Sequence, residues 1–285
     1  MEYCLAHLSD FHFTALGNDF DFGCALLDDA IAQGANHLVV TGDIVEAGQM
    51  EVVKGFVSYL KGRKWANPDR LTVTPGNHDI FPLSKRSLPT VNRPTALFQE
   101  FAKITSSCRT GSVRLVADEP YPFGKVLCRD VVLVGMDTTR NGQFNPRRWA
   151  EGELPEHHRE AVTEFFAVHS QAKHRIVAMH HHPWTEEFAG GNWMEQNFTT
   201  PPPEEVEAWL RACGATLVLC GHVHQEDGIE ERRLGRHCRV LRSGTAGGVD
   251  DEDEDGDKRR IYHLVELAEN GKVKIVRREF RDGED

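Results

Sequence analysis

Carboxylate, imidazole and amide side chains recur in five short clusters along the chain. The clusters occupy residues 9–12, 42–43, 76–79, 180–183 and 221–224. Aspartate, histidine and asparagine offer the oxygen and nitrogen ligands that suit Mn, Fe, Zn, Co or Ni ions. No cluster contributes a cysteine thiolate. The clusters therefore predict a transition-metal site and argue against a structural zinc site of the thiolate kind.

Each cluster directly follows a short apolar run that is typical of a buried strand. The runs span residues 4–8, 37–40, 71–74, 175–179 and 216–219. In open α/β sheets, ligands bind beyond the carboxyl ends of the strands. Glycines precede three of the candidate ligands, and they permit sharp turns and a close approach of the backbone to the site. Strand-end geometry thus predicts that separated segments meet at one place.

Asp43 occupies the middle of the set and is the natural ligand to be shared by two ions. Two ions can share seven side chains only if one carboxylate bridges them. Metal ions about 4 Å apart clamp a phosphoryl group and generate hydroxide at neutral pH. The residue types therefore predict hydrolysis of a small phosphate ester.

The ordered motifs D-x-H, G-D, G-N-H-D, H-H-P and G-H-x-H resemble those of the calcineurin-like metallophosphoesterase superfamily. They run from Asp10 to His224, about three quarters of the chain. The resemblance implies a β-sandwich flanked by helices and two metal ions, Mn or Fe above all, with Zn, Co or Ni as alternatives. It implies that His78 contacts the phosphate and assists the leaving group without binding metal. It also implies two ligand sets: Asp10, His12, Asp43 and His224 for one ion, and Asp43, Asn77, His181 and His222 for the other.

The triple histidine leaves the register of one ligand open. The first residue of the family's H-x-P triplet is the ligand, which indicates His181, while His182 is expected to support the ligands or to pack. Glu46 stands where the protein phosphatases carry the acid that orients their catalytic histidine. It either orients His78 or places a negative charge near a helix N-terminus.

The motifs differ from those of the protein Ser/Thr phosphatases at three positions, which favours another branch of the superfamily. The second motif, residues 42–48, lacks their arginine, Phe13 replaces a glycine, and the third motif ends in Asp79 instead of glutamate. The set is more similar to the class III cyclic nucleotide phosphodiesterases. We therefore expect a phosphodiesterase in which a metal-bridging hydroxide attacks in line. A phosphomonoesterase or protein phosphatase with the same metals is the alternative, and a non-catalytic scaffold is the alternative from a different class.

Several other residues have both a functional and a purely structural interpretation. A loop or cap insertion is expected at residues 186–203, where Trp193 and Phe198, together with Trp184, could stack a base or could simply pack the loop. Three arginines could reach a phosphate or be solvated: Arg93, Arg140 and Arg147. His157 and His158 carry no spacing signal and are assigned structural roles.

The alternation of strands and helices over the first eighty residues predicts a parallel sheet with helices outside. Helical spacing covers residues 22–32 and 50–60, and later 94–104, 155–170 and 204–213. Beyond residue 216 the chain is rich in strands. We expect one α/β domain over residues 1–285, a four-layer α-β-β-α sandwich of two mixed sheets.

Charge is concentrated in one segment. The net charge is −11, but residues 250–257 hold seven acidic side chains, and the remainder carries 33 basic against 37 acidic residues. No basic face suits a nucleic-acid polymer. The acidic run is expected to form a solvated hairpin loop, or alternatively a gate that repels anions or gathers metal.

General features of the sequence bear on the cellular compartment and the oligomeric state of the protein. No apolar run approaches the ~20 residues of a membrane helix, and the N-terminal residues lack a secretory pattern. Seven scattered cysteines without C-x-x-C spacing suit reduced thiols. These features predict a cytoplasmic protein without a membrane partner, and leave open a homodimer.

Overall fold

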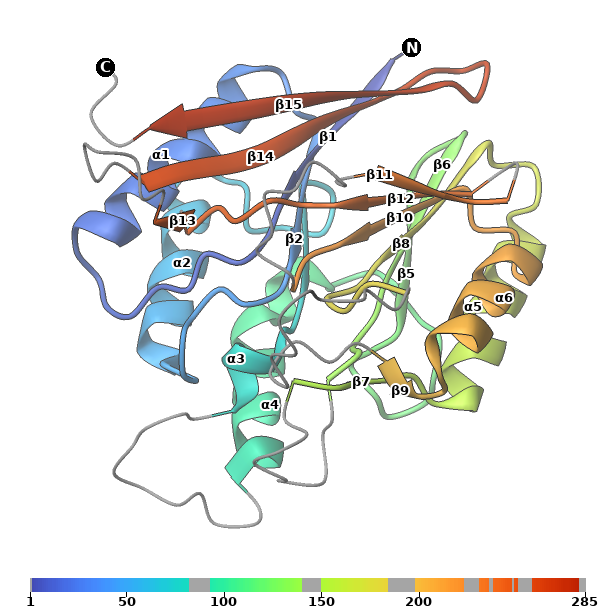
Figure 1. Cartoon of the computed structure of the whole chain (residues 1–285), viewed down its shortest axis with the longest axis horizontal. Helices are drawn as coiled ribbons and strands as arrows, with labels where there is room; N and C mark the ends of the chain where they lie inside the picture. The colour runs from blue at the N-terminus through green and yellow to red at the C-terminus, as the bar shows by residue number, and fades with distance from the viewer. Residues whose placement is uncertain are drawn as a thin grey trace.

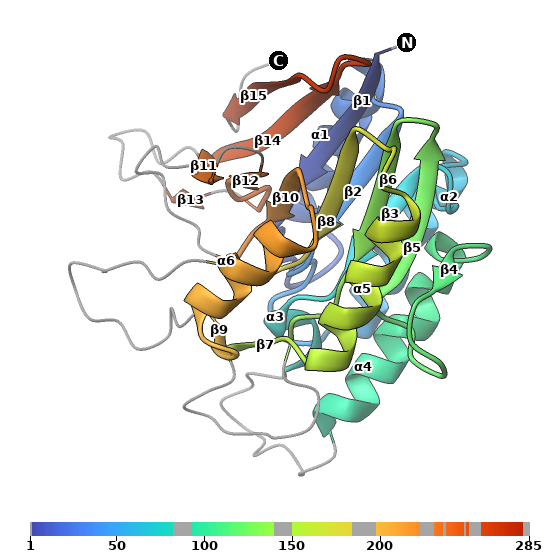
Figure 2. The same cartoon turned by 90° about the vertical axis from the view of Figure 1, so that its right-hand side faces the viewer.

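The computed structural model describes residues 2–81, 93–139, 150–183, 198–222, 231–235, 238–247, 249–250 and 258–281. Two β-sheets face one another, and helices cover the outer face of each (Figures 1 and 2). This is the predicted four-layer α-β-β-α sandwich of two mixed sheets. None of the described helices is long and apolar enough to cross a membrane.

The first sheet has the strand order β13-β14-β1-β2-β3, with β15 paired to β14. Its three N-terminal strands are parallel, and β14 joins β1 in the antiparallel direction. The carboxyl ends of three strands therefore lie at one edge. The strands are β1 (Tyr3–Leu8), β2 (His37–Thr41), β3 (Leu71–Thr74), β13 (Val249–Asp250), β14 (Lys258–Leu267) and β15 (Val273–Arg281).

The second sheet has the order β11-β12-β10-β8-β6-β5-β4. Its four central strands run parallel, and β5 and β11 are antiparallel to their neighbours. The strands are β4 (Val113–Arg114), β5 (Phe123–Cys128), β6 (Val131–Gly135), β8 (His174–Ala178), β10 (Leu217–Cys220), β11 (Glu231–Leu234) and β12 (Cys238–Arg242). A separate pair joins β7 (Gly152–Glu153) to β9 (Phe198–Thr200).

Strand alternation divides the apolar side chains among three cores. On β1, Leu5 belongs to the core between the sheets, whereas Ala6 and Leu8 face the helices. Helices α1 and α2 cover the first sheet, and α5 and α6 cover the second (Figure 2). The helices are α1 (Asn18–Ala32), α2 (Met50–Gly62), α3 (Asn77–Ile80), α4 (Arg93–Ile104), η1 (Thr105–Cys108), α5 (Glu156–Val168) and α6 (Pro203–Ala212).

Part of the predicted insertion at residues 186–203 is regular structure. Residues Phe198–Thr200 form β9, and α6 begins at Pro203. Residues 186–197 of the insertion lie outside the described residues, as do Trp184, Arg140 and Arg147, and Trp193 within the insertion. Within the acidic run, Asp250 belongs to β13, and residues 251–257 also lie outside the described part. All seven cysteines are free thiols.

Candidate metal centre

The candidate ligands begin where strands of both sheets end. Asp10 follows β1, Asp43 follows β2, and Asn77 opens the short helix α3 after β3. The second sheet contributes His180, just beyond β8, and His222, just beyond β10. The strand-end positions predicted from the sequence are thus brought together from both sheets.

Four of the ligands predicted from the sequence adopt a backbone conformation that non-glycine residues rarely take. The φ angles are +57° at Asp10, +49° at His12, +48° at Asp43 and +79° at His222. Such conformations cost free energy and persist where the surrounding structure enforces them. Four of the six such residues in the described part of the chain are predicted ligands, which marks this edge as a candidate functional site.

Backbone contacts between the strand-end loops enforce these conformations. The Asp10 amide donates to the Gly42 carbonyl at 3.2 Å, and the His12 amide donates to the Asp43 carbonyl at 3.0 Å. The Thr245 hydroxyl donates to the Asp10 carbonyl at 2.7 Å. The first loop is therefore locked to the second and to the segment after β12.

Two glycines leave room for the carboxylates. A Cβ atom on Gly76 would lie 2.1 Å from Asp43 Oδ1, and one on Gly221 would lie 2.3 Å from Asp10 Oδ2. Both distances are too short for any side chain. These glycines are required for the close backbone approach that the sequence predicted.

One group of candidate ligand atoms surrounds His180. Its Nε2 lies 2.9 Å from Asn77 Oδ1, 3.2 Å from Asp43 Oδ2 and 3.2 Å from His222 Nδ1. His180 Nδ1 lies 2.7 Å from the Thr41 carbonyl, which can only accept, so this nitrogen carries a proton. In the neutral ring, the Nε2 lone pair therefore points toward the oxygen atoms of Asn77 and Asp43. Converging lone pairs of this kind suit a cation.

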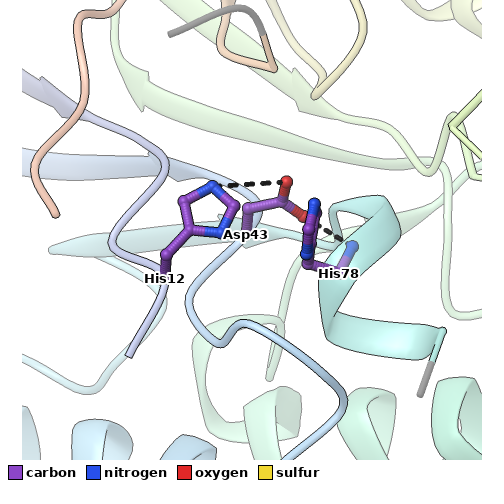
Figure 3. A group of neighbouring side chains, drawn as sticks. All are labelled: His12, Asp43 and His78. Carbon is purple, nitrogen blue, oxygen red and sulfur yellow. Dashed lines mark hydrogen bonds and ion pairs between the residues drawn. The ribbon is translucent and has the colours of Figure 1, made fainter. Parts of the chain in front are cut away.

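A second group of candidate ligand atoms also includes Asp43. His12 Nε2 is 3.8 Å from both Asp10 Oδ1 and Asp43 Oδ2. The His78 backbone amide donates to Asp43 Oδ1 at 2.8 Å. Figure 3 shows His12 and His78 on either side of the Asp43 carboxylate. Asp43 thus belongs to both groups, as a bridging ligand must.

The structure places His180, and not His181, among the candidate ligands. His181 Nδ1 lies 2.9 Å from Thr138 Oγ1, and its Nε2 lies 3.2 Å from the Ala150 carbonyl. Alternation along the strand explains the difference, since Ala178 faces the other sheet and Met179 faces the helices. His180 continues the first side and His181 the second. We therefore revise the predicted ligand from His181 to His180.

The sequence also singled out His182 and His224. His182 is buried and lies outside the groups of ligand atoms formed by the described residues. His224, the predicted fourth ligand of the first ion, lies outside the described residues.

Glu46 contacts both histidines of the second group: the contact with His78 is one of its two predicted roles, and the contact with His12 was not anticipated. Its carboxylate accepts a hydrogen bond from His12 Nδ1 at 2.7 Å. Its backbone carbonyl accepts one from His78 Nδ1 at 2.7 Å, and its carboxylate lies 3.6 Å from that nitrogen. Helix α2 begins later, at Met50. The side chain therefore orients His12, and the main chain orients His78.

Asp79 is a functional position that the sequence treated only as a branch marker. Its carboxylate accepts hydrogen bonds from the amides of Gly76 at 2.9 Å and Val45 at 3.1 Å. Burial and the charge of Asp43 raise the pKa of Asp79 to about 7. Its place directly after the G-N-H triplet was the available signal. Asp79 holds two of the strand-end loops together.

The electrostatics of the centre favour a bound cation. Burial lowers the pKa of His12, but the nearby carboxylates of Asp10 and Glu46 outweigh it and raise this pKa to about 10. For His180, Asp43 likewise outweighs burial and raises the pKa to about 9. Burial lowers the pKa of His78. The carboxylates thus hold protons on the candidate ligands, and a divalent ion can replace these protons. The donor set fits such ions.

Comparison with known proteins agrees with this fold. The chain is similar to a dimetal phosphatase from Danio rerio, with a TM-score of 0.65, 12% identity, and coverage of 98% of this chain and 96% of that one. It is also similar to purple acid phosphatase PPD1 from yellow lupin, with a TM-score of 0.56, 11% identity, and coverage of 98% and 52%. No curated protein matches.

A third similar structure has a description that names a structural role. GAP50, described as the anchor in the inner membrane complex of Plasmodium, has a TM-score of 0.54 and 12% identity, with coverage of 98% of this chain and 84% of that one.

The family model of the calcineurin-like phosphoesterases matches residues 5–226, which span every strand-end cluster. The chain belongs to the calcineurin-like phosphoesterase family.

Proposed function

We propose that the chain hydrolyses a phosphate ester with two transition-metal ions held between its two sheets. The observation that carries the proposal is the position of Asp43 between two groups of candidate ligand atoms. The ligands of one ion are Asp10, His12 and Asp43, with His224 as the predicted fourth. The ligands of the other are Asp43, Asn77, His180 and His222.

The bound ions supply charge stabilisation for the phosphoryl group and a nucleophile at neutral pH. The chain itself orients the groups around them. His78 Nδ1 donates to the Glu46 carbonyl, so Nε2 is the ring atom directed to a substrate. We assign His78, as the imidazolium, to proton transfer to the leaving oxygen: Nε2–H gives the proton, while Nδ1–H stays bonded to the Glu46 carbonyl. The negative charge of a bound phosphate favours the imidazolium form. Its position next to Asp43, at 2.8 Å through its amide, keeps it beside the phosphate.

The metals are proposed to be Mn or Fe, with Zn, Co and Ni as alternatives. Carboxylate, imidazole and amide ligands are compatible with each of these ions. Elemental analysis of the purified chain, before and after Mn²⁺ loading, measures the number and identity of ions. Two ions per chain are expected, and loaded protein without metal would refute the centre. The single domain over residues 1–285, the cytoplasmic location and the homodimer stay predictions.

Phosphodiesters, cyclic nucleotides among them, are the proposed substrates. Ala47 occupies the position at which protein phosphatases carry an arginine, next to the segment that orients His12 and His78. An alanine cannot supply the bidentate contact that a doubly charged phosphomonoester favours. A diester carries one negative charge and depends less on such a contact. Sequence similarity to the class III phosphodiesterases supports the same choice.

A hydrolysis panel tests the substrate class. Metal-loaded protein is assayed on 2′,3′- and 3′,5′-cyclic nucleotides, glycerophosphodiesters, and matched aryl mono- and diesters, with Asp43→Ala as the inactive control. Diesters are expected to show the higher kcat/KM. A tenfold preference for monoesters would establish the phosphatase alternative instead. Metal-loaded protein that hydrolyses none of them would favour the scaffold alternative.

A further inference from the structure

A second cluster of metal-ligating side chains lies at the N-terminal turn of α5. His158 Nε2 lies 2.7 Å from Glu119 Oε2, and His157 Nε2 lies 3.2 Å from Glu119 Oε1. The three ligand atoms are all within 4.8 Å of one another, and the two imidazole centroids are 4.4 Å apart. Glu119 and His157 are 38 positions apart, so sequence spacing alone gave no signal.

The residue types and distances suit a transition-metal ion. Two histidines and a glutamate form the protein ligand set of several zinc enzymes. Ligand atoms about 2.1 Å from a tetrahedral ion lie roughly 3.4 Å from one another. The nitrogen–oxygen distances, 2.7 Å from His158 to Oε2 and 3.2 Å from His157 to Oε1, are somewhat shorter than that spacing. All three ligand atoms lie within 4.8 Å of one another, so modest side-chain movements would bring them around one ion.

Access from solvent favours the same conclusion. The side chains of His157 and Glu119 are 55% and 42% exposed, so an ion can enter from solvent.

We propose that Glu119, His157 and His158 bind one divalent transition ion, such as Zn²⁺, separately from the centre around Asp43. The ion ties the segment between β4 and β5, which carries Glu119, to the start of α5. This site does not depend on the proposed hydrolytic function. The competing interpretation is a pair of N–H···O hydrogen bonds without an ion.

A Zn²⁺ titration of chelator-stripped full-length protein tests the site. The Asp43→Ala background removes most binding at the main centre, and a chromophoric chelator reports the dissociation constant. One ion per chain is expected to remain. His157→Ala in that background should weaken its binding at least tenfold. His169→Ala is the matched control, since this histidine packs on Phe165 near the other end of the helix.

The outcomes separate this proposal from the proposed function. If Asp43→Ala binds no Zn²⁺, the proposed site is overturned. It is also overturned if Asp43→Ala binds one ion and the added His157→Ala substitution does not weaken the binding of that ion. If Asp43→Ala instead binds as many ions as the wild type, the main centre is misassigned, and a His157-dependent ion still supports this site. Zn²⁺ should also raise the melting temperature of Asp43→Ala, and His157→Ala should abolish that rise. His157 is more than half exposed, so the substitution should not prevent folding.

Discussion

Hydrogen bonds on the far side of two imidazole rings determine which nitrogen faces the carboxylates. His12 Nδ1 donates to Glu46, and His180 Nδ1 donates to the Thr41 carbonyl. Each contact fixes the ring so that Nε2 points toward Asp43. Outer partners of this kind orient the ligands of metal sites and raise their basicity. The two rings are therefore oriented before any ion binds.

Replacement of the three adjacent histidines tests the revised ligand assignment. His180→Ala should cause the largest loss of bound metal, because its Nε2 lies 2.9 Å from Asn77 Oδ1 and 3.2 Å from Asp43 Oδ2. His181→Ala should retain most metal, since both ring nitrogens face Thr138 and Ala150. Elemental analysis of the desalted variants measures both. A larger loss from His181→Ala would restore the ligand that the motif predicted.

Glu46→Gln tests the support that this carboxylate gives to His12. Glutamine retains the shape of the side chain but removes its charge, so metal affinity should fall by about 10- to 100-fold. Competition with a chromophoric chelator measures the affinity. Glu51→Gln is a matched control, because Glu51 lies on α2 with its side chain 84% exposed. Equal affinity in the two variants would show that Glu46 does not support the ligand.

His78→Ala separates metal binding from proton transfer. The variant should keep its metals yet lose on the order of 10²–10⁴ in kcat, the usual size of a general acid–base contribution. The loss should be largest for diesters with a poor leaving group, because these need the proton most. Rates for aryl esters of graded leaving-group pKa measure this. Loss of metal, or a uniform loss across the series, would contradict the assignment.

At the level of secondary structure, the sequence predicts that the candidate ligands lie at strand ends. It does not predict which of two adjacent residues at a strand end faces the site. An apolar run followed by a polar cluster is visible in one sequence, and β1, β2 and β3 closely match their predicted ranges. Choosing His180 over His181 required the phase of β8, which depends on which face packs between the sheets. The Glu46–His12 contact joins residues 34 positions apart. The sequence contains no local signal for such a contact.

Lys125 on β5 makes a contact between sheets that can be tested by pH. Its ammonium donates to the carbonyls of Pro68 at 2.9 Å and Leu71 at 2.6 Å. Burial lowers the pKa of Lys125 to about 7. The folded state then binds fewer protons than the unfolded state between this pKa and the ordinary value of 10.5. The free energy of unfolding should therefore rise as pH increases through that window.

Lys125→Met provides the comparison, since methionine has a similar shape and no titratable group. Denaturant unfolding at several pH values above 7 should show a flatter dependence on pH for Lys125→Met than for the wild type. Lys54→Met, on the surface of α2, is the control and should follow the wild type because its side chain is 44% exposed. Parallel curves for wild type and Lys125→Met would contradict the lowered pKa.

For the whole molecule, the proposed ions join the two sheets. The described ligands come from β1, β2 and β3 in one sheet and from β8 and β10 in the other. An ion bound only by the folded state stabilises it, by about 2.7 kcal/mol at a hundredfold excess over the dissociation constant. Chelation should therefore lower the melting temperature of the wild type, measured by calorimetry. Asp43→Ala should respond much less, and equal shifts would contradict a shared centre.

The pairing of the first strand with β14 sets the order in which the molecule can be assembled during synthesis. Tyr3 of β1 pairs with Leu267 of β14, so β1 keeps an open edge until the residues of β14 have left the ribosome. His222 is translated 145 positions after Asn77, the last candidate ligand that follows a strand of the first sheet. A nascent chain can therefore pair β1, β2 and β3 long before it contains His222. The proposed ions can be retained only after both sheets have supplied their ligands, so metal uptake by the proposed centre follows the synthesis of both sheets.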